Sequence, residues 1–116
     1  MKSRFFELAK KTSLKSRYKF KIGTIIVRKG KVISLGFNDN RTHPKSPTPY
    51  HQLHAELSAI LNSGLKDFKD CEIYNYRETP TGKIAPSKPC IYCQKMLNSL
   101  NIKSVYYTDY EGYKKL

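Results

Sequence analysis

The sequence predicts a single α/β domain that spans residues 1–116 and is built on a mixed sheet. The chain has 116 residues, of which 39% are hydrophobic and 27% charged, and this is the size and composition of one globular domain. Short β-branched and aromatic runs alternate with segments of helical periodicity, which is typical of a layered α/β arrangement. An early hairpin adds an antiparallel strand pair, so the sheet is not wholly parallel.

The first third of the chain predicts a helix followed by a hairpin. Apolar residues recur at helical spacing over Ser3–Leu14, and the outer face of this helix is basic. Ile22–Val27 is an apolar, β-branched run, and Val32–Phe37 is a second strand. Arg28–Lys31, which contains a glycine, joins the two strands as a turn.

A long loop and a second helix follow the hairpin. Residues 38–52 contain three prolines among Asn, Asp, Thr and Ser, a composition that sustains neither a helix nor a central strand. Loops of this length inside a compact domain are usually functional, so this loop is a candidate wall of a substrate site. Leucine and isoleucine then recur at helical spacing from about Leu53 to a stop at Gly64.

The remainder of the chain predicts a strand, a loop, a helix and a further strand. The strand is Cys71–Tyr76, and the exposed loop is Glu78–Pro89, which is rich in Pro, Gly, Thr and Lys. The third helix is Cys90–Leu100 and the fourth strand is Lys103–Tyr107. We expect Thr108–Leu116 to be a short basic and aromatic tail, with room for only a short fifth strand.

The charge of the chain indicates an anionic partner. There are 22 Lys and Arg residues against 9 Asp and Glu, a formal net charge of +13. Such a balance favours a phosphorylated small molecule or a nucleic acid, although a solvated lysine-rich surface without a partner stays an alternative. The mean hydropathy of -0.61 excludes a long apolar span, and Met1–Lys11 is too short and interrupted for a signal peptide. We therefore expect no membrane association and a cytoplasmic location.

Two short motifs carry the chemistry. Cys90 and Cys93 stand three residues apart at the start of the third predicted helix, and the spacing lets them share one helix face and one metal ion. Three cysteines, an odd number, exclude a complete intrachain disulfide framework. His54, at the start of the second predicted helix, is the candidate third ligand.

The ligand types and their placement favour catalytic zinc. Two thiolates and one imidazole leave the fourth position of tetrahedral Zn²⁺ open for water. Helix N-termini favour thiolate formation at Cys90 and Cys93, because unpaired N–H groups and the helix dipole stabilise negative charge there. Glu56 lies in the first turn after His54, where both side chains can reach one point beyond the helix end. Glu56 is thus the candidate proton carrier.

His54-Ala55-Glu56 followed by Pro89-Cys90-Ile91-Tyr92-Cys93 resembles the signature of the zinc-dependent cytidine and deoxycytidylate deaminase superfamily. The superfamily also contains deaminases of tRNA adenosine and of cytidine in polynucleotides. The order of the elements resembles the family over most of the chain, and Phe68–Tyr113 in particular resembles small deaminase-like proteins common in bacteriophages. The resemblance implies a three-layer α/β/α fold with a mixed sheet of four to five strands.

The resemblance also implies roles for individual residues. His54, Cys90 and Cys93 would bind Zn²⁺, and Glu56 would move protons between water, the ring nitrogen and the leaving amine. Asn38 matches a position that contacts the substrate sugar, and Ala55 matches a backbone position that lines the base pocket. Many relatives have Glu where this chain has Lys88, and the added positive charge could favour a phosphate nearby.

Three functions stay open at this point. The first is hydrolytic deamination of cytosine in a free nucleotide or nucleoside, of the dCMP or cytidine type, which releases ammonia. The second is deamination of cytosine or adenine in single-stranded DNA, RNA or tRNA, bound through the basic surface. The third is a zinc-stabilised binding module in which His51 closes the site as a fourth ligand. Relatives often form homo-oligomers, but no residue of the chain demonstrates an interface.

Overall fold

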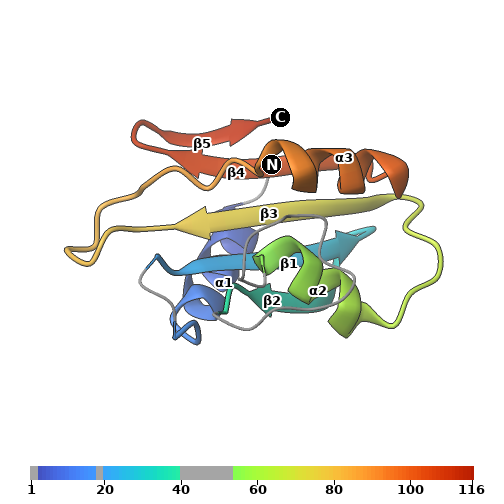
Figure 1. Ribbon diagram of the computed structural model, residues 1–116, viewed down its shortest axis with the longest axis horizontal. Coiled ribbons are helices and arrows are strands. Elements are labelled where there is room, and N and C mark those ends of the chain that lie inside the picture. The colour runs from blue at the N-terminus through green and yellow to red at the C-terminus, as the bar shows by residue number, and fades with distance from the viewer. Residues whose placement is uncertain (1–2, 18–19, 40–53) are drawn as a thin grey trace.

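The computed structural model describes residues 3–17, 20–39 and 54–116. These residues form three helices and five strands (Figure 1). In chain order they are α1 (Ser3–Ser13), β1 (Ile22–Arg28), β2 (Lys31–Phe37), α2 (Ala55–Ser63), β3 (Cys71–Arg77), α3 (Ile91–Ser99), β4 (Ser104–Asp109) and β5 (Gly112–Lys115).

The strands form one mixed sheet in the order β2-β1-β3-β4-β5. β1 is antiparallel to both β2 and β3, β3 is parallel to β4, and β4 is antiparallel to β5. Lys29 and Gly30 form the tight turn of the opening hairpin with φ values of 50° and 80°, the positive angles that a two-residue hairpin turn requires. The predicted mixed α/β fold is confirmed.

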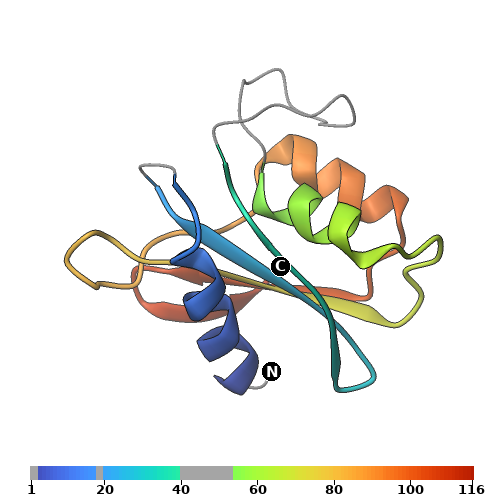
Figure 2. The same cartoon turned by 90° about the horizontal axis from the view of Figure 1, so that it is seen from below.

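Helices cover both faces of this sheet and make three layers. Figure 2 shows α1 on one face and α2 and α3 side by side on the other. Alternate residues of β1 supply the two cores, because successive side chains of a strand point to opposite faces. Ile25 and Val27 belong to the core beneath α1, which includes Phe6 and Tyr74. Ile26 belongs to the core beneath α2 and α3, which includes Ala59, Ile73 and Leu97.

Two glycines let the helices lie directly against the strands. A Cβ atom on Gly23 of β1 would lie 2.6 Å from the backbone nitrogen of Ser13 in α1. A Cβ atom on Gly36 of β2 would lie 2.7 Å from the carbonyl oxygen of Ala55, in the first turn of α2. Gly36 therefore fixes how closely the N-terminal end of α2 approaches the sheet.

The C-terminal segment forms the short fifth strand for which the sequence leaves room, rather than a free tail. β4 continues to Asp109, and Gly112–Lys115 pairs with it as β5. Tyr113 stacks on Phe6 of α1 with ring centroids 4.0 Å apart and planes within 8°. The basic residues of the segment suggested solvent exposure, but the aromatic contact with α1 and the ladder to β4 hold the strand in place.

The other predicted boundaries shift by a few residues. α1 ends at Ser13, and α3 begins at Ile91 because Cys90 is its N-cap residue. α2 begins at Ala55, two residues later than predicted, with His54 as its N-cap. Most of the predicted loop at 38–52, including His51, lies outside the described residues. No helix in the described part of the chain is long and apolar enough to cross a membrane.

We predict that Gly36→Ala lowers the free energy of unfolding by about 2 kcal/mol or more, because the added methyl group meets helix backbone that cannot rotate away. Thermal and urea denaturation measure this effect. Gly30→Asn is the matched control, since no atom lies within 4 Å of a Cβ at Gly30 and Asn tolerates its positive φ. Equal stability of Gly36→Ala and the native protein would contradict the close approach of α2.

Candidate active site

The candidate site lies at one edge of the sheet, where two helices begin. Asn38 follows the end of β2, Arg77 ends β3, and Ile22 begins β1, which runs in the opposite direction. The first residues of α2 and the segment before α3 complete a pocket of about 530 Å³. Ligand sites of open α/β sheets commonly lie at the carboxyl ends of strands, and this pocket follows that rule.

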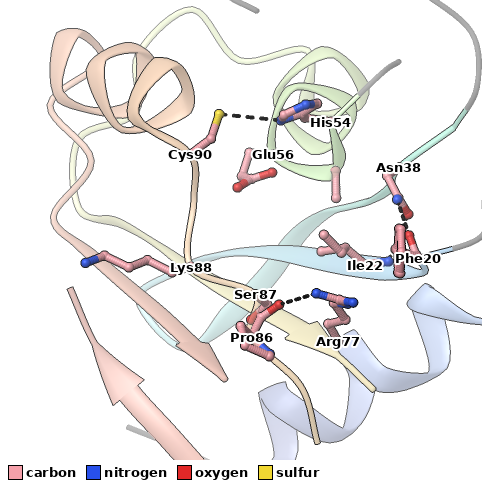
Figure 3. Close-up of a pocket in the computed structure, with 11 residues that line it drawn as sticks. Phe20, Ile22, Asn38, His54, Glu56, Arg77, Pro86, Ser87, Lys88 and Cys90 are labelled. Carbon is pink, nitrogen blue, oxygen red and sulfur yellow. Dashed lines mark hydrogen bonds between the residues drawn. The ribbon is translucent and has the colours of Figure 1, made fainter. Parts of the chain in front are cut away.

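The predicted metal ligands come together at the N-termini of α2 and α3. His54 is the N-cap residue of α2 and Cys90 that of α3, while Cys93 lies in the first turn of α3. The Nδ1 atom of His54 lies 3.8 Å from Sγ of Cys90 (Figure 3) and 3.3 Å from Sγ of Cys93. The ligand atoms of all three residues lie within 4.8 Å of one another.

This donor set fits Zn²⁺. An imidazole nitrogen and a thiolate sulfur bound to one tetrahedral zinc ion are about 3.6 Å apart, given the usual bond lengths. The two observed nitrogen to sulfur distances, 3.8 and 3.3 Å, lie on either side of that value. Among the described residues the group has three members, which is the ligand number of a catalytic rather than a closed site. His51, the suggested fourth ligand, lies outside those residues.

Burial opposes the thiolate form that the helix N-terminus was expected to favour. Cys93 is fully buried, and desolvation raises the pKa of its thiol well above the ordinary range. The neighbouring Glu56 carboxylate and Cys90 raise this pKa further. In the metal-free protein, burial thus acts against the thiolate form of Cys93. A bound divalent cation reverses the balance, because coordination deprotonates a thiol.

Glu56 is a buried carboxylic acid beside the ligand group. Its side chain is 4% exposed, and it lines the same pocket as His54 and Cys90. Desolvation raises the pKa of Glu56, while its backbone N–H, the charge of His54 and the Asn75 amide act in the opposite direction. A carboxyl group with a raised pKa exchanges protons more readily near neutral pH. This environment suits a proton carrier.

Asn75 of β3 orients the Glu56 carboxylate from the sheet. The Asn75 side chain, fully buried in β3, donates from Nδ2 to Oε2 of Glu56 at 3.1 Å and to the Ser87 carbonyl at 3.2 Å. Thr24 of β1 donates its hydroxyl to Oδ1 of Asn75 at 2.6 Å. Because Oδ1 accepts and Nδ2 donates, the amide has one orientation.

The segment before α3 is fastened to β3 and β4 through Ser87. The Ser87 hydroxyl bonds to the Asn75 carbonyl at 3.1 Å and to the Thr108 hydroxyl at 2.8 Å. The backbone N–H of Ser87 donates to the Thr108 carbonyl at 2.8 Å. Ser87 stands three residues before Cys90 in the sequence. The hydrogen bonds of Ser87 therefore connect the segment that carries the cysteine pair to Asn75, which holds the Glu56 carboxylate.

The two predicted substrate residues both line the pocket, in different ways. Ala55 is buried at the first turn of α2, next to Glu56. Asn38 is buried too, and its side-chain oxygen accepts from the backbone N–H of Ile22 at 2.8 Å. Its side-chain nitrogen donates to the carbonyl of Phe20. Both polar ends of the Asn38 side chain therefore help to hold the start of β1, and one donor and one acceptor position at most stay open for a substrate.

Two cations line the pocket, and only one of them points inward. Figure 3 shows the Arg77 guanidinium directed into the space between the labelled residues, opposite Glu56, whereas the Lys88 amine points away from it. The Arg77 guanidinium lies over the Phe20 ring, 4.8 Å from its centroid, and donates to the Pro86 carbonyl at 3.3 Å. Lys88, singled out from the sequence, thus contributes to the rim.

Four residues in and around the pocket were not predicted from the sequence: Thr24, Asn75, Arg77 and Ser87. The signal that could have found two of them is the alternation in β3. Ile73 faces the core beneath α2 and α3, so Asn75 and Arg77 occupy the same face two and four residues later. Polar residues that share a strand face with a buried apolar residue indicate a functional site rather than a hydrophobic core. Thr24 shows the same pattern in β1, two residues from the buried Ile26 on that face, whereas Ser87 lies outside the strands and carries no such signal.

Solved structures share this fold. A cytidine deaminase from Burkholderia pseudomallei has a TM-score of 0.75 and 23% identity, over 100% of this chain and 91% of the other. A dCMP deaminase from cyanophage S-TIM5 has a TM-score of 0.65 and 24% identity, over 92% and 84% of the two chains. A guanine deaminase from Bacillus subtilis has a TM-score of 0.56 and 25% identity, over 92% and 60%.

The sequence is also similar to that of a probable deoxycytidylate deaminase from Caenorhabditis elegans. The two are 28% identical over 120 residues, which cover 91% of this chain and 56% of the relative. The chain thus spans little more than half the length of that relative. Residues 1–109 match the family model described as the cytidine and deoxycytidylate deaminase zinc-binding region. The match includes both signature motifs, and the chain belongs to the cytidine and deoxycytidylate deaminase family.

Proposed function

We propose that this protein is a zinc-dependent deaminase that hydrolyses the amino group of cytosine in a free nucleotide or nucleoside and releases ammonia. The observation that carries the proposal is the placement of the buried Glu56 carboxyl in the same pocket as His54 and Cys90, two of the three residues of the ligand group. A zinc-stabilised binding module would have no use for a buried carboxylic acid next to three metal donors. Burying such a group without a function is costly.

The residues of the pocket divide the chemistry between them. Zinc held by His54, Cys90 and Cys93 would lower the pKa of water and so supply a nucleophile at neutral pH. Glu56 accepts a proton from the attacking water and gives it to the ring nitrogen beside the reacting carbon. It then passes a proton to the amine, which leaves as ammonia while the carbon to oxygen bond becomes the carbonyl of uracil. Asn75 holds the carboxylate in position throughout.

The pocket dimensions favour a small substrate. A volume of about 530 Å³ is within the range of small-ligand sites. The basic residues of α1, which suggested a polynucleotide, lie on the face of the sheet opposite α2 and α3 (Figure 2). The α1 charge therefore does not line the approach to Glu56. A polynucleotide substrate is the second candidate, and the net charge of +13 is the observation that favours it.

We predict that Glu56→Gln lowers the rate of ammonia release by about 100- to 10,000-fold, because the amide cannot carry a proton. The zinc-loaded protein and the variant are incubated with dCMP, cytidine, adenosine and a mixed-sequence single-stranded DNA. Ammonia is measured enzymatically and the products by mass spectrometry. Both proteins should hold the same amount of zinc.

Conversion of dCMP or cytidine by the native protein alone would support the proposal. Conversion of cytosine only within the DNA strand, with a rate that falls steeply as salt rises, would overturn it in favour of the polynucleotide function. Equal activity of the native and Glu56→Gln proteins would contradict the role of Glu56.

We predict that Cys93→Ser reduces bound zinc from about one ion per chain to a small fraction of that, since structural and catalytic zinc sites of this kind depend on thiolate donors. Metal content after dialysis is measured by elemental analysis. Cys71→Ala is the matched control, because Cys71 is a buried free thiol that belongs to the core rather than to the ligand group. Full zinc content in Cys93→Ser would argue against this ligand set.

We predict that Asn75→Asp lowers kcat by about 10- to 100-fold while KM stays within about threefold, because a residue that orients a catalytic group affects the reaction step more than binding. The substitution keeps the shape and replaces the donor to Glu56 by an acceptor. Asn98→Asp makes the same chemical change on the exposed side of α3. A higher KM with an unchanged kcat in Asn75→Asp would instead assign Asn75 to substrate binding.

A further inference from the structure

We propose that Arg77 is the anion-recognition residue of the pocket and that it selects a nucleoside monophosphate over the uncharged nucleoside. This inference rests on the proposed function, because it assigns the charged end of that substrate. The anion that we assign to Arg77 is the phosphate monoester of a single nucleotide. Neither signature motif includes Arg77, and none of the three candidate zinc ligands lies next to it in sequence.

The sheet register directs Arg77 into the site. On the face of the sheet covered by α2 and α3, Thr24 of β1 lies opposite Asn75 of β3, and Ile22 lies opposite Arg77. Asn75 contacts Glu56, and Arg77 is the next residue of β3 on the same face, at the open end of the strand. Along β3, Arg77 thus lies about two residues farther than Asn75 from the His54, Cys90 and Cys93 group.

The backbone of Arg77 is fixed on both sides. Its N–H donates to the Thr108 hydroxyl of β4 at 3.3 Å, and its carbonyl accepts from the Ala85 N–H at 2.9 Å. The guanidinium rests on the Phe20 ring, 4.8 Å from the centroid. A flat cation held between an aromatic face and a fixed strand end loses little freedom when it binds a ligand.

The guanidinium keeps unused donors. One terminal nitrogen donates to the Pro86 carbonyl at 3.3 Å. The Nε atom is buried and has no hydrogen-bond partner. Among the described residues, Arg77 also has no carboxylate partner, although Glu56 lies across the same pocket (Figure 3). Buried donors of a charged group are normally satisfied, and an anion would satisfy these.

The arrangement of the pocket assigns the anion to the far end of the substrate. The amino group that leaves has to face Glu56 and the ligand group, which lie on one side of the pocket. Arg77 lies on the opposite side of the pocket, with its guanidinium over the Phe20 ring. A nucleotide has its reactive base amine and its phosphate at opposite ends. Guanidinium groups match phosphate oxygens with two parallel donors, which a neutral hydroxyl cannot exploit.

The test measures binding rather than turnover. Zinc-loaded Glu56→Gln protein serves as the background, and titration calorimetry gives Kd values for dCMP, deoxycytidine and a short oligodeoxynucleotide with one central cytosine. Arg77→Gln is added to this background. We expect dCMP to bind at least about tenfold tighter than deoxycytidine, and Arg77→Gln to remove most of that preference without weakening deoxycytidine more than about twofold. Arg77→Lys should retain part of the preference.

Lys83→Gln is the matched control, because Lys83 is exposed in the loop between β3 and α3 and its removal lowers the net charge equally. An equal loss of preference in Lys83→Gln would overturn the proposal, because net charge alone would explain it. An equal loss of affinity for dCMP and deoxycytidine in Arg77→Gln, in a protein of native thermal stability, would overturn it as well. Tighter binding of the oligodeoxynucleotide than of dCMP would show that Arg77 contacts the phosphate of a polymer, and would overturn the proposal that it recognises a phosphate monoester.

Turnover by the native protein separates this proposal from the proposed function. Ammonia release from neither dCMP nor deoxycytidine, with an Arg77-dependent preference in binding, would contradict the function and support the anion site. Ammonia release from both at equal kcat/KM, with no preference in binding, would contradict the anion site and support the function.

Discussion

The meeting of two helix N-termini over one sheet edge is the constraint on which the site depends. His54 and Cys90 occupy the N-cap positions of α2 and α3. Their donor atoms and that of Cys93 lie within 4.8 Å of one another. α2 reaches this point because Gly36 lets its backbone lie against β2. α3 reaches it because the preceding segment is fastened to β3 and β4. A shift of either helix would separate the donors.

The polar network beneath Glu56 links the fold to the chemistry. Thr24, Asn75 and Ser87 lie on three different segments, and each is buried and hydrogen-bonded. Such a network is stable only if every member is satisfied, which is why it specifies one orientation for the Asn75 amide and one for the Glu56 carboxylate. The apolar contacts of the same face lie farther along the strands, at Ile26 and Ile73. The sheet face therefore changes from core to site within one strand.

The sequence was informative where a pattern had a local cause. Helical and strand periodicity predicted the elements and the mixed sheet, and the spacing of His54, Glu56, Cys90 and Cys93 predicted a group that the structure brings together. It was uninformative where distant segments decide the outcome. The strand at Gly112–Lys115 depends on stacking between Tyr113 and Phe6, and the inward direction of Arg77 depends on pairing with β1. The burial of Cys93, which raises the pKa of its thiol in the metal-free protein, was not predicted, because periodicity says little about how deeply a helix end is buried.

The central claim is that α2 and α3 jointly present two sulfur donors and one nitrogen donor to a single metal ion. X-ray absorption spectroscopy at the zinc edge, on protein loaded with one equivalent of zinc, tests it most directly. We expect two sulfur neighbours at about 2.3 Å and lighter donors at about 2.0–2.1 Å. Four sulfur neighbours, or a shell of nitrogen and oxygen alone, would contradict it.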